Sequence, residues 1–345
     1  MSVGFPAIAW TQSKKRYDLL ILTGVVLYLA AFIGAMGVMH PEVTPETMII
    51  RATGTLAFFM LHVILAIGPL ARLNRAFLPL LYNRRHLGVS MFLLALIHGG
   101  FSIFQFHGLG DQIALISVFT SNTDYQSWLD FPFQVLGFIA LFILFLMAGS
   151  SHDYWLKNLT PRVWKSLHMG VYVAWVLIIF HVFLGVLQLE KDPGLYYTVV
   201  LGMVIIPGLH VAGAMFGAAK PVAIGSRSED GFVAVLKADE IPLDRAVMAS
   251  IDDQDVAIYR YENKVSAVSN LCRHQQGPLS EGKVIDGCIT CPWHGWQYKP
   301  EDGCSPPPFE EKIPTFRVRI EAGVVLVHPE PLAPGTFTEP AILEA

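Results

Sequence analysis

Six long apolar stretches occupy the first two thirds of the chain. Each is about 20 residues long, which is the length that an α-helix needs to cross the hydrocarbon core of a bilayer. In lipid, only a helix satisfies all the backbone hydrogen bonds within a single segment of this kind. The pattern therefore predicts six membrane-spanning helices, at residues 18–39, 49–70, 87–107, 131–150, 167–187 and 197–217.

The pattern changes after Lys220 and Pro221. Short runs that alternate apolar and polar residues follow one another, separated by Gly, Pro and Asp, as in GFVAVLKA and GVVLVHP. Such runs are typical of strands in a small antiparallel domain. The last residues are rich in Pro and acidic side chains, and we expect them to form a flexible tail. The sequence thus predicts a multi-domain protein, with a six-helix transmembrane α-bundle followed by a small all-β domain. The predicted parts are an N-terminal segment (1–17), the bundle (18–219), the β-domain (220–330) and the tail (331–345).

Composition agrees with a membrane protein. Hydrophobic residues make up 53% of the chain and charged residues 15%, which is too apolar for an ordinary soluble protein. The net charge is +4 over residues 1–220 and −8 over residues 221–345, so the two halves suit different environments. Neither half has the basic surface that nucleic-acid binding requires, and we predict no nucleic-acid partner.

Positive charges gather on one side of the predicted bundle. The N-terminal segment, the 71–86 and 151–166 loops and Lys220 hold 11 Lys and Arg residues. The opposite side holds only Arg51 and Lys191. By the positive-inside rule both termini are predicted to be cytoplasmic, in a multi-pass protein of the inner (plasma) membrane.

Histidines recur inside the apolar stretches. Ionisable side chains at membrane depth are costly and usually functional. Imidazole is a common axial ligand of haem, and the core of a helix bundle is a common cofactor site. A single membrane histidine can equally serve as an interhelical hydrogen-bonding group, and this alternative is strongest for His62, His107 and His210. The number of histidines favours a cofactor: His62, His86, His98, His107, His168, His181 and His210 lie in or near the spans.

Three of the apolar runs resemble a known family. The runs ATGTLAFFMLHVILAIGPLARL, RRHLGVSMFLLALIHGG and WKSLHMGVYVAWVLIIFHVFLG are similar to the ferric reductase-like transmembrane domain, and especially to the haem-binding membrane subunit of the periplasmic methionine sulfoxide reductase system. The resemblance covers residues 18–215. It implies transmembrane electron transfer through one or two b-type haems, and the haem ligands of the family map onto His98, His168 and His181.

Depth along the helices indicates how two haems would be stacked. His86 and His168 lie at the inner ends of the third and fifth spans, and His98 and His181 lie 12 and 13 residues further on. At about 1.5 Å per residue this separation is roughly 18–20 Å. We therefore predict one haem between His98 and His181 and a second between His86 and His168. For His86 the alternative is an interfacial basic residue beside two arginines.

A second ligand pattern lies in the β-domain. The run LCRHQQGPLSEGKVIDGCITCPWHGWQY has the spacing C-x-H-x16-C-x2-H. Two loops that each give one thiolate and one imidazole suit a [2Fe–2S] cluster with one Cys₂ iron and one His₂ iron. Tetrahedral zinc is the alternative. The flanking GPLSEG and CPWHGW resemble Rieske ferredoxin domains, so we predict one Rieske cluster per chain, on Cys272, His274, Cys291 and His294.

Two departures from respiratory Rieske proteins point to the ferredoxin or oxygenase branch of that family. The respiratory proteins have a disulfide between the ligand loops, where this chain has Gly277 and Trp293. Trp296 replaces a hydroxyl residue that hydrogen-bonds the cluster in that branch. Because fewer hydrogen bonds to the sulfurs favour a lower potential, we expect a midpoint near the lower end of the range of about −150 to +300 mV.

The sequence limits the chemistry that follows. The region after His294 has no room for the mononuclear iron of an oxygenase, and neither G-x-G-x-x-G nor a P-loop is present. Electrons must therefore come from a cytosolic donor such as a flavin reductase, or from a quinone. We predict an oxidoreductase component that passes electrons between a cytosolic cluster and haem, towards a periplasmic or membrane acceptor. The alternatives are a transmembrane ferric, metal or quinone reductase component, and a redox sensor.

Overall fold

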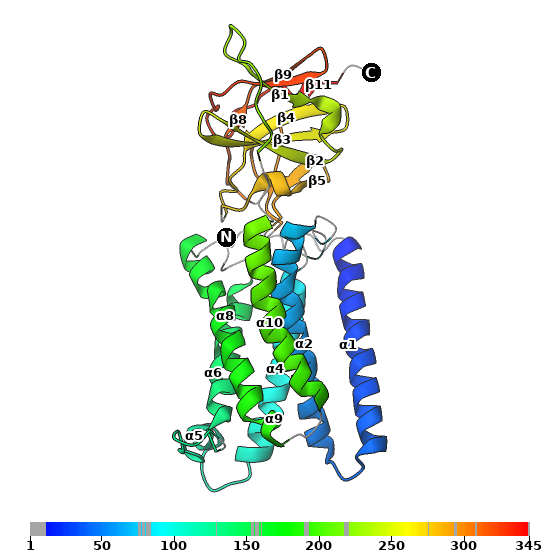
Figure 1. Ribbon diagram of the computed structural model, residues 1–345, viewed down its shortest axis with the longest axis vertical. Coiled ribbons are helices and arrows are strands. Elements are labelled where there is room, and N and C mark those ends of the chain that lie inside the picture. Colours follow the sequence, from blue (N-terminus) through cyan, green and yellow to red (C-terminus); the bar gives the residue numbers. More distant parts are fainter. Residues whose placement is uncertain are drawn as a thin grey trace, which may run out of the picture. The chain divides into compact units, whose positions relative to one another are not determined.

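The computed structural model separates the chain into two compact units, one built of helices and one of strands (Figure 1). The residues that the structure describes are 12–74, 77, 80, 84–128, 130–152, 155, 159, 161–189, 193–216, 221–274, 276–292, 295–307 and 309–343.

In the part of the chain that the structure describes, six long helices form the helical unit, and all six are long and apolar enough to cross a membrane. This confirms the predicted number of spans. Three of them begin with Pro, which is well tolerated there because the first backbone N–H groups of a helix have no hydrogen-bonding partner within the helix. Two short helices, α5 (Ala114–Thr120) and α9 (Val186–Leu189), were not predicted. The long helices are α1 (Gln12–Met39), α2 (Pro45–Leu73), α4 (Arg84–His107), α6 (Phe133–Ser150), α8 (Pro161–Leu184) and α10 (Pro193–Phe216).

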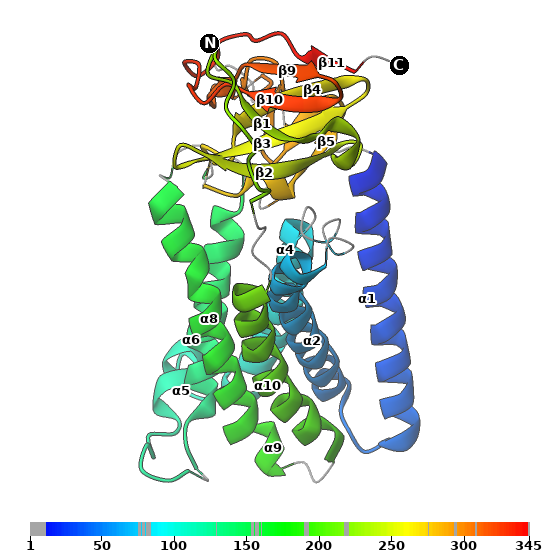
Figure 2. The same cartoon turned by 45° about the horizontal axis from the view of Figure 1, so that its top comes forward.

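The core of the bundle is centred on α2, which lies beside α4 and α10 (Figures 1 and 2). Leu61 and Ile67 of α2 are each only 1% exposed, whereas the outer faces of the helices carry large apolar side chains, as lipid contact requires. Close approach uses small residues: a Cβ on Gly213 of α10 would lie 3.2 Å from the Cα of Pro69 in α2. Helices α2 and α10 are therefore closely packed at this point.

The second unit is a small all-β domain, as predicted, although strand β2 was missed. One sheet has the order β1-β10-β9, and the other has the order β11-β4-β3-β2-β5-β6-β7, with β8 paired to β4. The paired strands are antiparallel. The strands are β1 (Val233–Lys237), β2 (Arg245–Ile251), β3 (Gln254–Tyr261), β4 (Lys264–Ser269), β5 (Lys283–Ile285), β6 (Cys288–Thr290), β7 (Gln297–Tyr298), β8 (Thr315–Phe316), β9 (Val318–Glu321), β10 (Val324–Val327) and β11 (Ala341–Ile342).

The C-terminal segment differs from the sequence prediction. Instead of a loose tail, its described residues lie along the β-domain and end in β11, which pairs with β4. The backbone N–H groups of Leu332, Thr338 and Leu343 each donate to a carbonyl of the domain, at 2.8–2.9 Å. The sequence does not predict this arrangement, because the segment is rich in proline and makes isolated hydrogen bonds instead of a continuous ladder. It covers part of an edge of β4 that would otherwise be open.

Candidate functional site

The first ligand loop lies between β4 and β5. The Cys272 N–H donates to the Gly277 carbonyl (3.0 Å), and the Gln276 N–H donates to the Cys272 carbonyl (2.7 Å). Gln276 has φ +59°, so the chain reverses sharply there. This tight loop turns Cys272 and His274 inward, with only 1% and 6% of each residue exposed.

The second ligand loop lies between β6 and β7. The Cys291 N–H donates to the Trp296 carbonyl (2.7 Å), and the Gly295 N–H donates to the Cys291 carbonyl (2.9 Å). Gly295 has φ +72°, a conformation that glycine adopts without strain. Cys291 is 1% exposed. The fourth predicted ligand, His294, lies outside the described residues, as does Trp293.

The described ligand residues fit a two-iron cluster. Cys272 and Cys291 form no disulfide and lie in one group of buried side chains. Burial lowers the pKa of His274 to about 4, so its imidazole is neutral, which is the form that binds metal. Among the described residues, no three His, Cys, Asp or Glu side chains are grouped around a single-ion site. A Rieske cluster needs no such group, because each of its irons takes two protein ligands.

Trp296 supports the second loop without offering its N–H to the cluster. Its indole stacks on the His274 ring, with centroids 4.3 Å apart and planes inclined by 3°. The indole N–H donates to the Ser305 hydroxyl at 3.1 Å. Trp296 therefore orients the His274 imidazole by packing, and its N–H is already used by Ser305.

Tyr298 is a residue of the site that the sequence reasoning missed. Its hydroxyl lies 3.4 Å from the Cys272 Sγ and accepts the Arg273 N–H at 3.0 Å. Burial and the neighbouring Cys272 raise the pKa of Tyr298, so the hydroxyl keeps its proton. Since the oxygen already accepts a hydrogen bond, that proton can point at the sulfur. The signal in the sequence was the last residue of the CPWHGWQY run.

The structure brings two of the predicted membrane ligands together. The ring centroids of His98 in α4 and His181 in α8 lie 6.2 Å apart, with the ring planes inclined by 85°. Two imidazoles on opposite faces of one iron have centres roughly 6 Å apart, because each metal–nitrogen bond is about 2 Å long. Each Nδ1 is held at 2.9 Å by a backbone carbonyl, that of Ile50 for His98 and that of Phe133 for His181. The separation and the orientation both fit a bis-histidine haem.

Glycines make room for these two rings. A Cβ on Gly54 of α2 would lie 2.6 Å from the His98 Nδ1, and a Cβ on Gly137 of α6 would lie 2.6 Å from the His181 Nδ1. Real Cβ atoms do not approach so closely. Each histidine is therefore seated against a neighbouring helix at a position that requires glycine.

Two other membrane histidines use both ring nitrogens within the bundle. The His62 Nδ1 lies 2.8 Å from the Phe58 carbonyl, and its Nε2 accepts the Trp175 indole N–H at 3.2 Å. The His210 Nδ1 lies 2.9 Å from the Ile206 carbonyl, and its Nε2 lies 2.9 Å from the Tyr172 hydroxyl. Neither has a nitrogen left for a metal, which agrees with their interpretation as hydrogen-bonding residues.

The two predicted inner ligands, His168 and His86, have separate surroundings. The His168 Nδ1 lies 3.1 Å from the Trp164 carbonyl, and its ring stacks on that of Trp164. Its Nε2 lies 3.3 Å from the Ser151 hydroxyl, which already donates to the Met147 carbonyl at 2.7 Å. The His86 Nδ1 lies 2.6 Å from an Asp18 carboxylate oxygen. In both histidines Nδ1 is engaged by a hydrogen-bonding partner. The Nε2 of His168 has only the long contact with Ser151, and among the described residues the Nε2 of His86 has no hydrogen-bonding partner.

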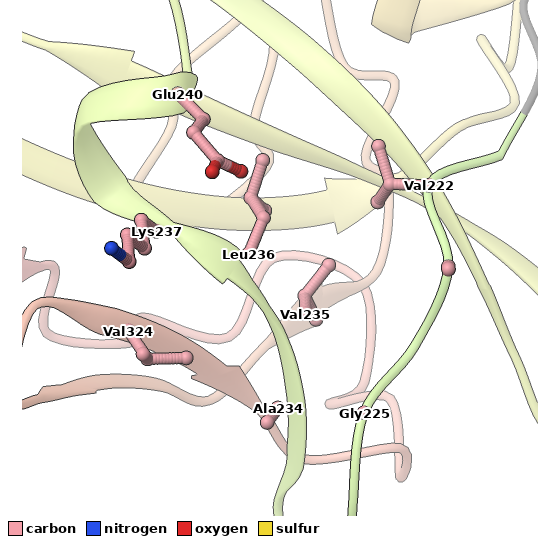
Figure 3. A pocket seen from close by; sticks show the side chains of 9 residues that line it. Val222, Gly225, Ala234, Val235, Leu236, Lys237, Glu240 and Val324 are labelled. Carbon is pink, nitrogen blue, oxygen red and sulfur yellow. The ribbon is translucent and has the colours of Figure 1, made fainter.

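The β-domain also has a groove of about 470 Å³ (Figure 3). It is largely apolar and contains none of the predicted ligands. Its lining residues include Val222, Gly225, Val235, Leu236, Lys237, Glu240 and Val324.

Family models match both units. Residues 231–317 match the Rieske [2Fe-2S] domain, and residues 53–179 match the ferric reductase like transmembrane component.

Among individual relatives, the biphenyl dioxygenase ferredoxin subunit of Pseudomonas sp. (strain KKS102) is 34% identical over 28% of this chain and 90% of its own length. The ferredoxin component of the alkene monooxygenase system of Xanthobacter autotrophicus is 31% identical, over 24% and 68% respectively. A cholesterol 7-desaturase of Xenopus laevis is 46% identical over 18% of this chain, which spans only 14% of that desaturase. Among solved structures, a chain in the complex of oxygenase and ferredoxin of carbazole 1,9a-dioxygenase is 24% identical, with a TM-score of 0.28. The match covers 30% of this chain and 97% of the solved chain.

Proposed function

The chain belongs to the Rieske [2Fe–2S] family through its β-domain and carries a ferric reductase-like transmembrane component in its bundle, and on that premise we propose that it passes electrons between a cytosolic cluster and b-type haem in the membrane. The cluster and haem supply one-electron redox chemistry when bound. The side chains of the protein bind and orient these cofactors and shield them from water.

The observation that carries this proposal is the His98–His181 pair. Two histidines from different helices face one another at 6.2 Å between ring centroids, inside a tightly packed apolar bundle. Each has its Nδ1 engaged by a carbonyl of a neighbouring helix, which leaves Nε2 as the metal-binding nitrogen. We assign these two side chains as the axial ligands of the outer haem.

In the β-domain, we assign Cys272 and Cys291 to one iron and His274 and His294 to the other. The two thiols are buried, and the described imidazole is neutral, which is the form that binds metal. The likeness to ferredoxin components of oxygenase systems favours electron transfer over oxygenation as the task of this domain. A redox protein in the cytosol, such as a flavin reductase, or a quinone is the donor that we propose.

A second, inner haem between His168 and His86 extends the proposal. These histidines lie 13 and 12 residues before the outer pair along their helices, which separates the two levels by roughly 18–20 Å. With the termini on the cytoplasmic side, as the positive-inside rule indicates, the inner haem would lie near the membrane face of the donor. Electrons would then leave at the opposite face, to a periplasmic or membrane acceptor.

The test uses the purified full-length protein in lipid nanodiscs, titrated anaerobically with dithionite and followed by EPR and visible absorbance. The wild type should show a Rieske signal and a b-type haem spectrum. His98→Ala and His181→Ala should each lower the haem content, whereas His210→Ala, a matched membrane histidine with both nitrogens used, should keep it. Full haem content in both of the first two variants would refute the assignment.

A second measurement asks whether electrons pass between the cofactors. NADH with a flavoprotein ferredoxin reductase is added as an artificial donor, and haem reduction is followed by stopped flow. Haem reduction should be fast in the wild type and lost in His274→Ala, although dithionite still reduces the haem of that variant. A cluster that is reduced while the haem stays oxidised would instead favour the redox sensor. Rapid reoxidation of the haem by an added quinone or ferric chelate would identify a transmembrane reductase.

A further inference from the structure

The Ser305 hydroxyl anchors the indole that covers His274. Its Oγ accepts the Trp296 indole N–H at 3.1 Å, and only 7% of Ser305 is exposed. The face of the same indole lies against the His274 ring, with centroids 4.3 Å apart. Ser305 is therefore connected to a proposed cluster ligand through a single side chain, although it belongs to neither ligand loop.

The backbone fixes the position of this hydroxyl. The Ser305 N–H donates to the Glu311 carbonyl at 2.9 Å, which closes the loop that lies between these two residues. Phe309 belongs to that loop and packs against the Trp296 indole, with ring centroids 4.3 Å apart and planes inclined by 54°. The loop therefore gives Trp296 one polar contact and one aromatic contact.

The hydrogen bond to Ser305 determines how the indole lies. Trp296 is only 6% exposed, so its N–H has little access to water, and a buried N–H without a partner is costly. Ser305 supplies the partner in an orientation that inclines the Trp296 and His274 ring planes by only 3°. The hydrogen bond thus stabilises the stacked arrangement over other orientations of the indole.

An indole stacked on a ligand imidazole changes the surroundings of the metal. The apolar shell around a metal site controls solvent access and the local dielectric, and through them the redox potential. Reduction adds one negative charge to the cluster, and water stabilises that charge better than an apolar ring does. Because the indole helps to bury His274, which is 6% exposed, it favours the oxidised state and lowers the potential.

We infer that Ser305 is a positioning residue for the cluster, which through Trp296 fixes the His274 ring, keeps water away from it and holds the cluster potential low. This rests on the proposed function, because it presupposes a Rieske cluster on His274. Electrons move towards the higher potential, so a cluster of lower potential is a better donor to haem. Ser305 therefore favours electron transfer from the cluster to the membrane.

Ser305→Ala tests this in the full-length protein in nanodiscs, by an anaerobic redox titration followed by EPR. Without its anchor the indole should tilt away from the His274 ring and admit water. The Rieske signal should remain, with shifted and broader g-values. The midpoint should rise by up to about 59 mV, which is a tenfold change in the ratio of reduced to oxidised cluster. Ser305→Thr keeps the hydroxyl and should stay close to the wild-type midpoint.

A double variant distinguishes an action through Trp296 from a separate effect of Ser305. Trp296→Phe keeps an aromatic ring but removes the N–H, so it should raise the midpoint as Ser305→Ala does. If both changes break the same contact, the double variant should shift the midpoint no further than either single variant. Additive shifts would overturn the inference, as would a wild-type midpoint and wild-type g-values in Trp296→Phe.

Ser266→Ala is the matched control. Ser266 is another buried serine of the same domain, and its Oγ lies 2.9 Å from the Tyr261 hydroxyl, so its loss also removes one buried hydrogen bond. The midpoint and the g-values should not change in this variant. An equal rise in Ser266→Ala would show that any loosening of the domain raises the potential, and would overturn the inference.

The wild type distinguishes failure of the inference from failure of the proposed function. If the wild type has no Rieske signal, or if its reduced cluster leaves the haem oxidised, the proposed function is wrong. If the wild type has the signal and passes electrons to haem, but Ser305→Ala keeps the wild-type midpoint and g-values, only the inference is wrong.

Discussion

Replacing Tyr298 by Phe should lower the midpoint potential of the Rieske cluster. The change removes one oxygen atom, which lies 3.4 Å from the Cys272 Sγ and is held in place by the Arg273 N–H at 3.0 Å. Tyr298 is fully buried, so no solvent screens this contact. A hydrogen bond to a cluster sulfur stabilises the reduced state more than the oxidised one, because the reduced cluster carries one more negative charge.

The size of the effect follows from the strength of that hydrogen bond. Hydrogen bonds to charged groups contribute about 1.5–3 kcal/mol, compared with about 1 kcal/mol for neutral ones. If the bond strengthens by about 1 kcal/mol on reduction, the midpoint should fall by roughly 40 mV when it is lost. Removal of the acceptor for the Arg273 N–H should also destabilise the domain, by about 1–3 kcal/mol.

An EPR-monitored redox titration of the full-length protein measures this shift. Tyr261→Phe is the matched control, because Tyr261 is another buried tyrosine of the same domain, and its hydroxyl lies 2.9 Å from the Ser266 Oγ. It should leave the midpoint unchanged. An unchanged or higher midpoint in Tyr298→Phe, with the Rieske signal retained, would refute the reasoning about the hydroxyl.

Three further predictions concern the two centres. Changing His274 or His294 to Ala or Cys should abolish the Rieske EPR signal and leave the haem spectrum intact, and loss of haem in a well-folded variant would contradict the separation of the centres. The wild-type cluster should have a midpoint near the lower end of the Rieske range, and a value above roughly +100 mV would rule out this assignment to the ferredoxin or oxygenase branch. Gly137→Ala should displace the His181 ring and lower the haem content, whereas Gly149→Ala in the same helix, where a Cβ meets nothing within 4 Å, should not.

The architecture could be predicted because its signals are local in the sequence. Each membrane span is a continuous apolar run, and each ligand loop is a short motif between strands. The C-terminal strand β11 and the Tyr298 contact depend on partners far along the chain. Tyr298 reaches Cys272 across 26 positions, and β11 pairs with β4 although more than 70 residues separate them. The local sequence around either partner therefore does not predict these contacts.

The same limit explains why counting membrane histidines does not identify ligands. By sequence, His62 and His98 are alike, since each is an imidazole inside an apolar helix. What separates them is the partner of the second ring nitrogen. The His62 Nε2 accepts a hydrogen bond from Trp175, which is 113 positions away, whereas His98 faces His181. A buried imidazole whose two nitrogens are both hydrogen-bonded is stable without a metal. In the described structure His98 and His181 each engage only Nδ1, which keeps Nε2 available for a metal. Ligand assignment in such a bundle therefore depends on the hydrogen-bond partners of each ring more than on the depth of the residue.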